Sequence, residues 1–193
     1  MINDLDATLA ELLRRTAPLT TQVAISFAPP DRTFPPSSVV LPAIDLFLYD
    51  IRENRDLRSN EPLIERGADG MVTMRPPPTR VDCSYLITAW PSPASPAAIQ
   101  EEHQLIGEVM VALLRYPILP AQLLKGVLAD QPLPPPTAAL QAGSLQSMGE
   151  FWQALDGKPK VALHYTVTIA VASGQPAVEA PPVRDMRTRL RPI

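Results

Sequence analysis

The chain has 193 residues, of which 46% are hydrophobic and 19% are charged, and its formal net charge is -3. A chain of this length can bury a substantial core as one domain, and its acidic balance offers no general attraction for nucleic acid. Its 24 prolines and 8 glycines stay below the share of about 25–30% that marks low-complexity disorder. We therefore expect a globular protein with proline-rich loops and no nucleic-acid partner.

The amino-terminal segment 3–16 is predicted to form the first helix. Asn3 is a suitable N-cap, and Arg14 and Arg15 suit the other end of the helix dipole. The apolar positions that recur at helical spacing are Ile2, Leu5, Leu9, Leu12 and Leu13. No segment of the chain reaches the length of about 18 apolar residues that a membrane span requires, and no signal peptide is visible. We expect cytoplasmic synthesis.

Three segments in the first half are predicted to be strands: 22–27, 43–51 and 80–90. Apolar residues occupy both faces of 43–51, which favours a central strand covered on both sides. Strand parity places Asp45 and Asp50 on opposite faces, so they are not expected to form an acid/base pair. The lone Cys83 is expected to be buried, in a reducing compartment.

The long connection 52–78 between two of these strands contains glycines and then a proline-rich run that begins after Arg75. We expect a short edge strand or hairpin arm within it, near 63–65 and 71–74. Connections of this length are often functional.

The second half is predicted to contain helices at 97–115 and 147–155 and a strand at 160–171. Ser147 and Glu150 have the spacing of a capping box. The longer helix is expected to cover the sheet with one apolar stripe, formed by Ile99, Ile106, Met110, Leu113 and Leu114. The order of elements predicts an α+β fold, with a mostly antiparallel mixed sheet packed against two main helices.

A change of composition divides the chain into a domain at 1–174 and an extended basic arm at 175–193. The arm's basic residues are Arg184, Arg187, Arg189 and Arg191. Docking on an acidic protein surface and a merely solvated tail are about equally favoured for them.

The sequence shows no catalytic, metal or cofactor motif. No glycine-rich phosphate loop is present, and His103 and His164 lack the spacing of metal ligands. A solvated helix face for His103 and a surface position for His164 are the favoured interpretations over a ligand or a base. Trp90 and Trp152 are expected to anchor the core or a subunit interface. We expect no enzyme activity and no cofactor.

The chain resembles the tail-terminator (cap) proteins of extracellular contractile injection systems, which are phage-tail-like particles with an inner tube and a contracting sheath. The order and spacing of short motifs over residues 3–172 are the basis of this resemblance. The motifs are the first helix, IDLFLYDIREN at 44–54, RPPP at 75–78, YLITAW at 85–90, EHQLIG at 102–107, FWQAL at 151–155 and HYTV at 164–167.

The resemblance implies a structural cap without catalytic residues. It implies a ring, with six copies as the expected number, at the baseplate-distal end that terminates the inner tube and anchors the sheath. Candidate partner contacts are Arg75 and the four arginines of the arm, Arg184, Arg187, Arg189 and Arg191. Two alternatives stay open: an assembly adaptor or chaperone that is not retained in the particle, and a small-molecule-binding protein with an unrecognised site.

Overall fold

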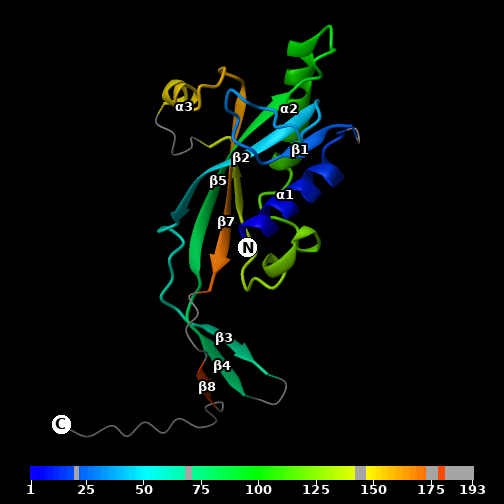
Figure 1. The fold of residues 1–193 in the computed structure, drawn as a ribbon. Coiled ribbons are helices and arrows are strands. Elements are labelled where there is room, and N and C mark those ends of the chain that lie inside the picture. Colours follow the sequence, from blue (N-terminus) through cyan, green and yellow to red (C-terminus); the bar gives the residue numbers. More distant parts are fainter. Residues whose placement is uncertain (20–21, 68–70, 142–146, 173–177, 181–193) are drawn as a thin grey trace, which may run out of the picture.

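The computed structural model describes residues 1–19, 22–67, 71–141, 147–172 and 178–180. A five-stranded mixed sheet organises the molecule, in the order β1-β2-β5-β7-β6 (Figure 1). Its strands are β1 (Ala24–Ser26), β2 (Ala43–Glu53), β5 (Thr79–Trp90), β7 (Ala162–Val171) and β6 (Thr137–Ala139). Only β1 and β2 pair in parallel, and the other neighbours are antiparallel. The predicted α+β class with a mostly antiparallel mixed sheet is confirmed.

Two long helices cover one face of this sheet, and a short helix lies on the other (Figure 1). The long helices are α1 (Ile2–Thr16) and α2 (Ala98–Leu114). The leucine stripe of α1 packs with inward-facing residues of the central strands, such as Tyr85 and Ile87, in one hydrophobic core. Two 3-10 turns, η1 (Ala121–Leu123) and η2 (Gly126–Leu128), add Leu123 and Leu128 to this core.

The short helix α3 (Met148–Ala154) begins at the predicted cap, because Ser147 Oγ accepts a hydrogen bond from the Glu150 backbone N–H at 3.2 Å. Its Phe151 ring lies 6.2 Å from the Phe47 ring and 6.4 Å from the Tyr49 ring. These aromatic contacts hold α3 against β2, on the face opposite α1.

Three local predictions are wrong: two concern the boundaries of elements and one concerns which residues of α2 are buried. The first helix begins at Ile2, and its N-cap position is Met1, without a side-chain cap, so Asn3 lies inside the helix. The first strand is limited to Ala24–Ser26. Ile99 and Leu114, which were assigned to the buried stripe of α2, are more than half exposed. The face of α2 that meets the sheet is centred on Val109 instead, so Leu114 lies too far around the helix to reach it.

The prediction that the strand at 43–51 is an interior strand covered on both faces is confirmed, because β2 lies between β1 and β5 with helices on both faces. The prediction about Asp45 and Asp50 is wrong because of a bulge in β2. The register moves from Leu48 opposite Tyr85 to Asp50 opposite Ser84, so Tyr49 is an extra residue. Asp45 pairs with Thr88, which has the same parity as Ser84, and therefore Asp45 and Asp50 lie on the same face of the sheet.

A second, three-stranded sheet lies beyond the first residues of β5 and the last residues of β7, which pair with each other (Figure 1). Its strands are β3 (Leu63–Arg66), β4 (Val72–Arg75) and β8 (Val178–Ala180), in the order β3-β4-β8. The hairpin expected within 52–78 therefore exists, and part of the C-terminal segment pairs with it antiparallel. Among the described residues, no helix combines the length and apolar composition needed to cross a bilayer.

Candidate assembly surfaces

The side of α2 that faces away from the sheet carries two exposed apolar side chains among polar ones. Val111 and Leu114 are 54% and 52% exposed, and they follow His103 and Gly107 at spacings that keep all four residues on one side of the helix. We call this set, His103, Gly107, Val111 and Leu114, the outer α2 face. The inner side of α2 supplies the core, so Val111 and Leu114 are apolar residues that the fold of this chain leaves uncovered.

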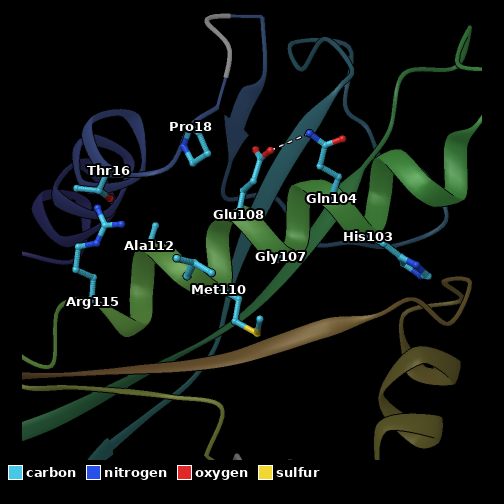
Figure 2. Close-up of a pocket in the computed structure, with 10 residues that line it drawn as sticks. Thr16, Pro18, His103, Gln104, Gly107, Glu108, Met110, Ala112 and Arg115 are labelled. Atoms are coloured by element: carbon cyan, nitrogen blue, oxygen red, sulfur yellow. Dashed lines mark hydrogen bonds between the residues drawn. The ribbon is translucent and has the colours of Figure 1, made fainter.

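A groove of about 660 Å³ runs along the outer α2 face, between α2 and the end of α1 (Figure 2). Thr16 and Pro18 form its α1 wall, and Gln104 Nε2 donates a 2.9 Å hydrogen bond to Glu108 Oε1 along its rim. A Cβ built on Gly107 would meet no atom within 4 Å. Glycine inside a helix costs about 1 kcal/mol relative to alanine, so packing within this chain does not explain Gly107.

The second candidate surface is the small sheet of β3, β4 and β8, which we call the arm sheet. Among the described residues, each of its outer strands, β3 and β8, has one side without a strand partner in the sheet order. Unpaired strand edges are sites at which another chain can add a strand. The arm sheet therefore projects from the body and has backbone groups at its edges to which a strand of another chain can pair.

A smaller cavity of about 240 Å³ lies where the arm connects to the body, lined by Leu63, Pro77, Pro78 and Arg80 among others. Arg80 Nε is buried and has no hydrogen-bond partner among the described residues. Burial lowers the pKa of Arg80, and the nearby Asp82 carboxylate opposes this effect.

Of the predicted contact arginines, Arg75 lies in the described part of the chain. Arg75 ends β4, opposite Leu63 of β3, and is exposed, so it belongs to the arm sheet. Arg184, Arg187, Arg189 and Arg191 lie outside the described residues. Their contact with a partner stays a prediction.

Cys83 and His164, the candidates for a nucleophile and a base, are packed within the fold. Cys83 is fully buried in β5, and burial raises the pKa of its thiol to about 11, which suppresses the reactive thiolate. His164 Nδ1 lies 3.3 Å from the Tyr49 hydroxyl, and burial lowers the pKa of this histidine. Within the described part of the chain, no group of three or more potential metal ligands lies close together.

Both tryptophans anchor packing, as expected. Trp152 is buried beside Phe151 at a centroid distance of 5.5 Å. The Trp90 ring lies 4.3 Å from that of Phe34, and Lys160 Nζ lies 4.7 Å from the Trp90 ring centre.

The sequence prediction missed the outer α2 face. A signal was present, because Gly107, Val111 and Leu114 recur at intervals of four and three residues and form a second apolar side. The prediction assigned the apolar residues of this helix to a single stripe, which hid the second side.

An α+β body with a projecting arm sheet and an uncovered apolar helix face is typical of a structural subunit that assembles with other subunits. The comparison with protein families agrees with this class. The model described as the Pvc16 N-terminal domain matches residues 4–185, so the chain belongs to that family.

Two solved structures from contractile particles are similar to the chain. One is the PVC sheath/tube terminator of an extracellular contractile injection system in its extended state, with 28% identity and a TM-score of 0.65. The alignment covers 100% of this chain and 64% of that one. The other is the anti-feeding prophage cap, a tube terminating cap, with 29% identity, a TM-score of 0.65 and coverage of 98% and 61%. The resemblance to tail terminators is thereby confirmed.

The chain spans less than two thirds of the length of these two relatives. No curated protein matches it.

Proposed function

We propose that this protein is a structural cap of a contractile injection system, which terminates the inner tube and anchors the sheath. The observation that supports the proposal most directly is the likeness along the whole chain to two terminator proteins at 28% and 29% identity. A cap needs surfaces and no reaction centre, which agrees with the buried Cys83 and the packed His164. We infer no enzyme activity.

The cap is proposed to act as a ring, with six copies as the expected number, at the baseplate-distal end of the particle. A ring requires a heterologous contact, in which one face of a subunit meets a different face of the next. The outer α2 face is the candidate for one half of this contact, because it is apolar, grooved and open around Gly107. The absence of a side chain at Gly107 would allow the backbone of a neighbouring subunit to approach α2 closely.

The arm sheet is proposed to contact the sheath, by accepting or lending a strand at the free edges of β3 or β8. This assignment gives the body and the arm different tasks: the body forms the ring, and the arm attaches it to the sheath. The protein would be made in the cytoplasm and then assembled into the particle.

The mass of the assembled species in solution tests the proposal. Light scattering or native mass spectrometry should give a ring, with about six subunits per particle, whereas a persistent monomer in the presence of tube and sheath proteins would contradict it. Mass spectrometry of purified particles separates the cap from its closest rival. An adaptor or chaperone would be absent from finished particles, and a cap would be present in a fixed ratio to the baseplate.

A further inference from the structure

Asp45 is a buried carboxyl group without a hydrogen-bond partner. Its side chain is 0% exposed, and neither of its oxygens accepts a hydrogen bond of normal geometry from any described residue. An ionised carboxylate in such a position loses its hydration and gains nothing in exchange. Burial at this position therefore favours the neutral, protonated form of the group.

Two hydroxyl groups flank Asp45, and neither donates to it a hydrogen bond of normal geometry. Ser26 of β1 pairs with Asp45 in register, and its Oγ accepts the Ala28 backbone N–H at 3.2 Å. Thr88 of β5 pairs with Asp45 on the other side, and its Oγ1 accepts from Trp90 Nε1 at 2.9 Å. Both Ser26 and Thr88 are buried, so the site between β1 and β5 is dry.

Burial raises the pKa of Asp45 to about 7. The Ser26 hydroxyl and the Ala28 backbone N–H oppose the rise, and no charged side chain contributes to it. Other titratable groups lie on the elements around this part of the sheet. They are Asp31 and Arg32 of the loop 27–42, Asp50 of β2, Arg80 and Asp82 of β5, Glu102 of α2, Asp156 after α3, Lys160 before β7 and His164 of β7. Arg32 pairs with Asp156, and Lys160 pairs with Glu102, so these four charges are neutralised elsewhere.

The strand beside Asp45 is weakly attached. β1 has three residues at the edge of the sheet and pairs only with Ala43–Asp45. A carboxylate that forms inside the sheet regains its hydration if water reaches it. The opening that breaks the fewest backbone hydrogen bonds is at this edge, between β1 and β2. Displacement of β1 would expose Asp45 and leave the pairing of β2 with β5 intact.

We propose that Asp45 makes the attachment of β1 and of the adjoining loop 27–42 pH-dependent. At acidic pH the protonated side chain fits the dry site, and the edge is closed. As the pH rises toward neutrality and above, ionisation favours the open, hydrated edge. The device is built into the fold and does not depend on the role of the protein as a cap.

The direction and size follow from linkage. A raised pKa means that the closed state binds the proton more tightly than the open state, in which Asp45 has its ordinary pKa. The open population should therefore grow with pH from about pH 4, by about tenfold between pH 6 and pH 8, and then level off.

Hydrogen exchange of the whole protein, measured by mass spectrometry between pH 5 and pH 9 and corrected for the intrinsic exchange rate, tests the proposal. Peptides that contain residues 23–28 should lose about tenfold in protection between pH 6 and pH 8, while peptides of β5 should not. Asp45→Asn should remove this pH dependence. Asp56→Asn, at an exposed carboxylate, is the matched control and should retain it. Equal pH dependence in the Asp45→Asn protein, or none in the unmodified protein, would overturn the proposal.

A direct measurement covers the case in which Asp45→Asn does not fold. The carboxyl carbon chemical shift of Asp45, followed by NMR in the unmodified protein, should titrate with a midpoint near pH 7. A midpoint below pH 5 would show that the carboxylate is tolerated in the sheet, and the inference would then be wrong.

Discussion

The hydroxyl group of Tyr85 donates a 2.8 Å hydrogen bond to Asp6 Oδ1. Tyr85 lies fully buried in the central strand β5, and Asp6 lies in the second turn of α1. This bond therefore connects the middle of the sheet to the helix that covers it. Burial raises the pKa of Asp6, and the hydrogen bond from Tyr85 opposes that rise.

Tyr85→Phe should destabilise the fold, because it keeps the ring but leaves the half-buried Asp6 without its donor. We expect a loss of about 1.5 kcal/mol at pH 8, and a smaller loss at pH 3, where the carboxyl is protonated. Urea unfolding at the two pH values measures both quantities.

Asp6→Asn provides the control for this interaction. Because the pKa of Asp6 is raised in the fold, its ionisation lowers stability as the pH rises through that pKa. Asp6→Asn should therefore reduce the loss of stability between acidic and neutral pH. A double-mutant cycle that finds no coupling between the two positions would contradict the assigned role of the bond.

Gly107→Ala should stabilise the isolated chain and weaken its assembly. A methyl group at this position meets no atom of the chain within 4 Å, so helix propensity alone predicts a gain of about 1 kcal/mol. If a neighbouring subunit packs against the outer α2 face, the same methyl group, and more strongly the side chain of Gly107→Leu, should obstruct the contact. Thermal unfolding and the mass of the assembled species measure the two effects.

Gly149→Ala in α3 is the matched control, because its added methyl group also has space, with Ser147 Oγ 3.8 Å away. It should leave assembly unchanged. Rings that form equally well with Gly107→Leu would remove the outer α2 face from the proposed ring contact.

Much of the fold could be predicted because the strand patterns are local. The sequence of β5 alternates Val81, Cys83 and Tyr85 with Asp82 and Ser84, and the side formed by Val81, Cys83 and Tyr85 is the one that packs in the core with the helices. The interior position of β2 was predictable as well, because its two apolar sides meet α1 and α2 on one face and the aromatic ring of α3 on the other. The strand order could not be predicted, because it depends on contacts distant in the sequence.

The candidate surfaces were harder to predict than the core. The bulge at Tyr49 reverses parity along β2, and no residue type at that position signals it. The pairing of β8 with β4 joins segments about a hundred residues apart. The sequence indicated the connection 52–78 and the segment 175–193 as two separate arms. The structure pairs β4 of the first with β8 of the second in one sheet.

Lys160→Met should destabilise the fold by about 3 kcal/mol. Lys160 Nζ lies 2.5 Å from Glu102 Oε2, and both side chains are largely buried, with 13% and 16% exposed. Removal of the ammonium group leaves the Glu102 carboxylate without its partner in a poorly hydrated position, and the contact with Trp90 is also lost.

Arg15→Gln tests the contrasting case of an exposed ion pair. Arg15 contacts Glu11 on the surface of α1, with 58% and 27% of the side chains exposed, and its loss should cost less than about 0.5 kcal/mol. Chemical denaturation of both variants gives the comparison. Similar small losses would mean that water reaches the Lys160–Glu102 pair.

Deletion of residues 176–193 should leave the body folded and disable attachment to the sheath. The deletion removes β8, whose pairing within the described part of the chain is with β4 of the arm sheet, so the free energy of unfolding of the body should change little. It also removes a strand and four arginines that could contact a neighbour. Electron microscopy of assembled particles should then show sheaths that detach, overrun or fail to form, and particles of normal length that still fire would contradict the proposal.

A second variant distinguishes the contribution of the strand from that of the charge: it keeps β8 and replaces with glutamine only Arg184, Arg187, Arg189 and Arg191. If strand pairing holds the sheath, this variant should assemble normally at physiological salt, whereas charge-based docking predicts the same defect as the deletion, made worse by added salt.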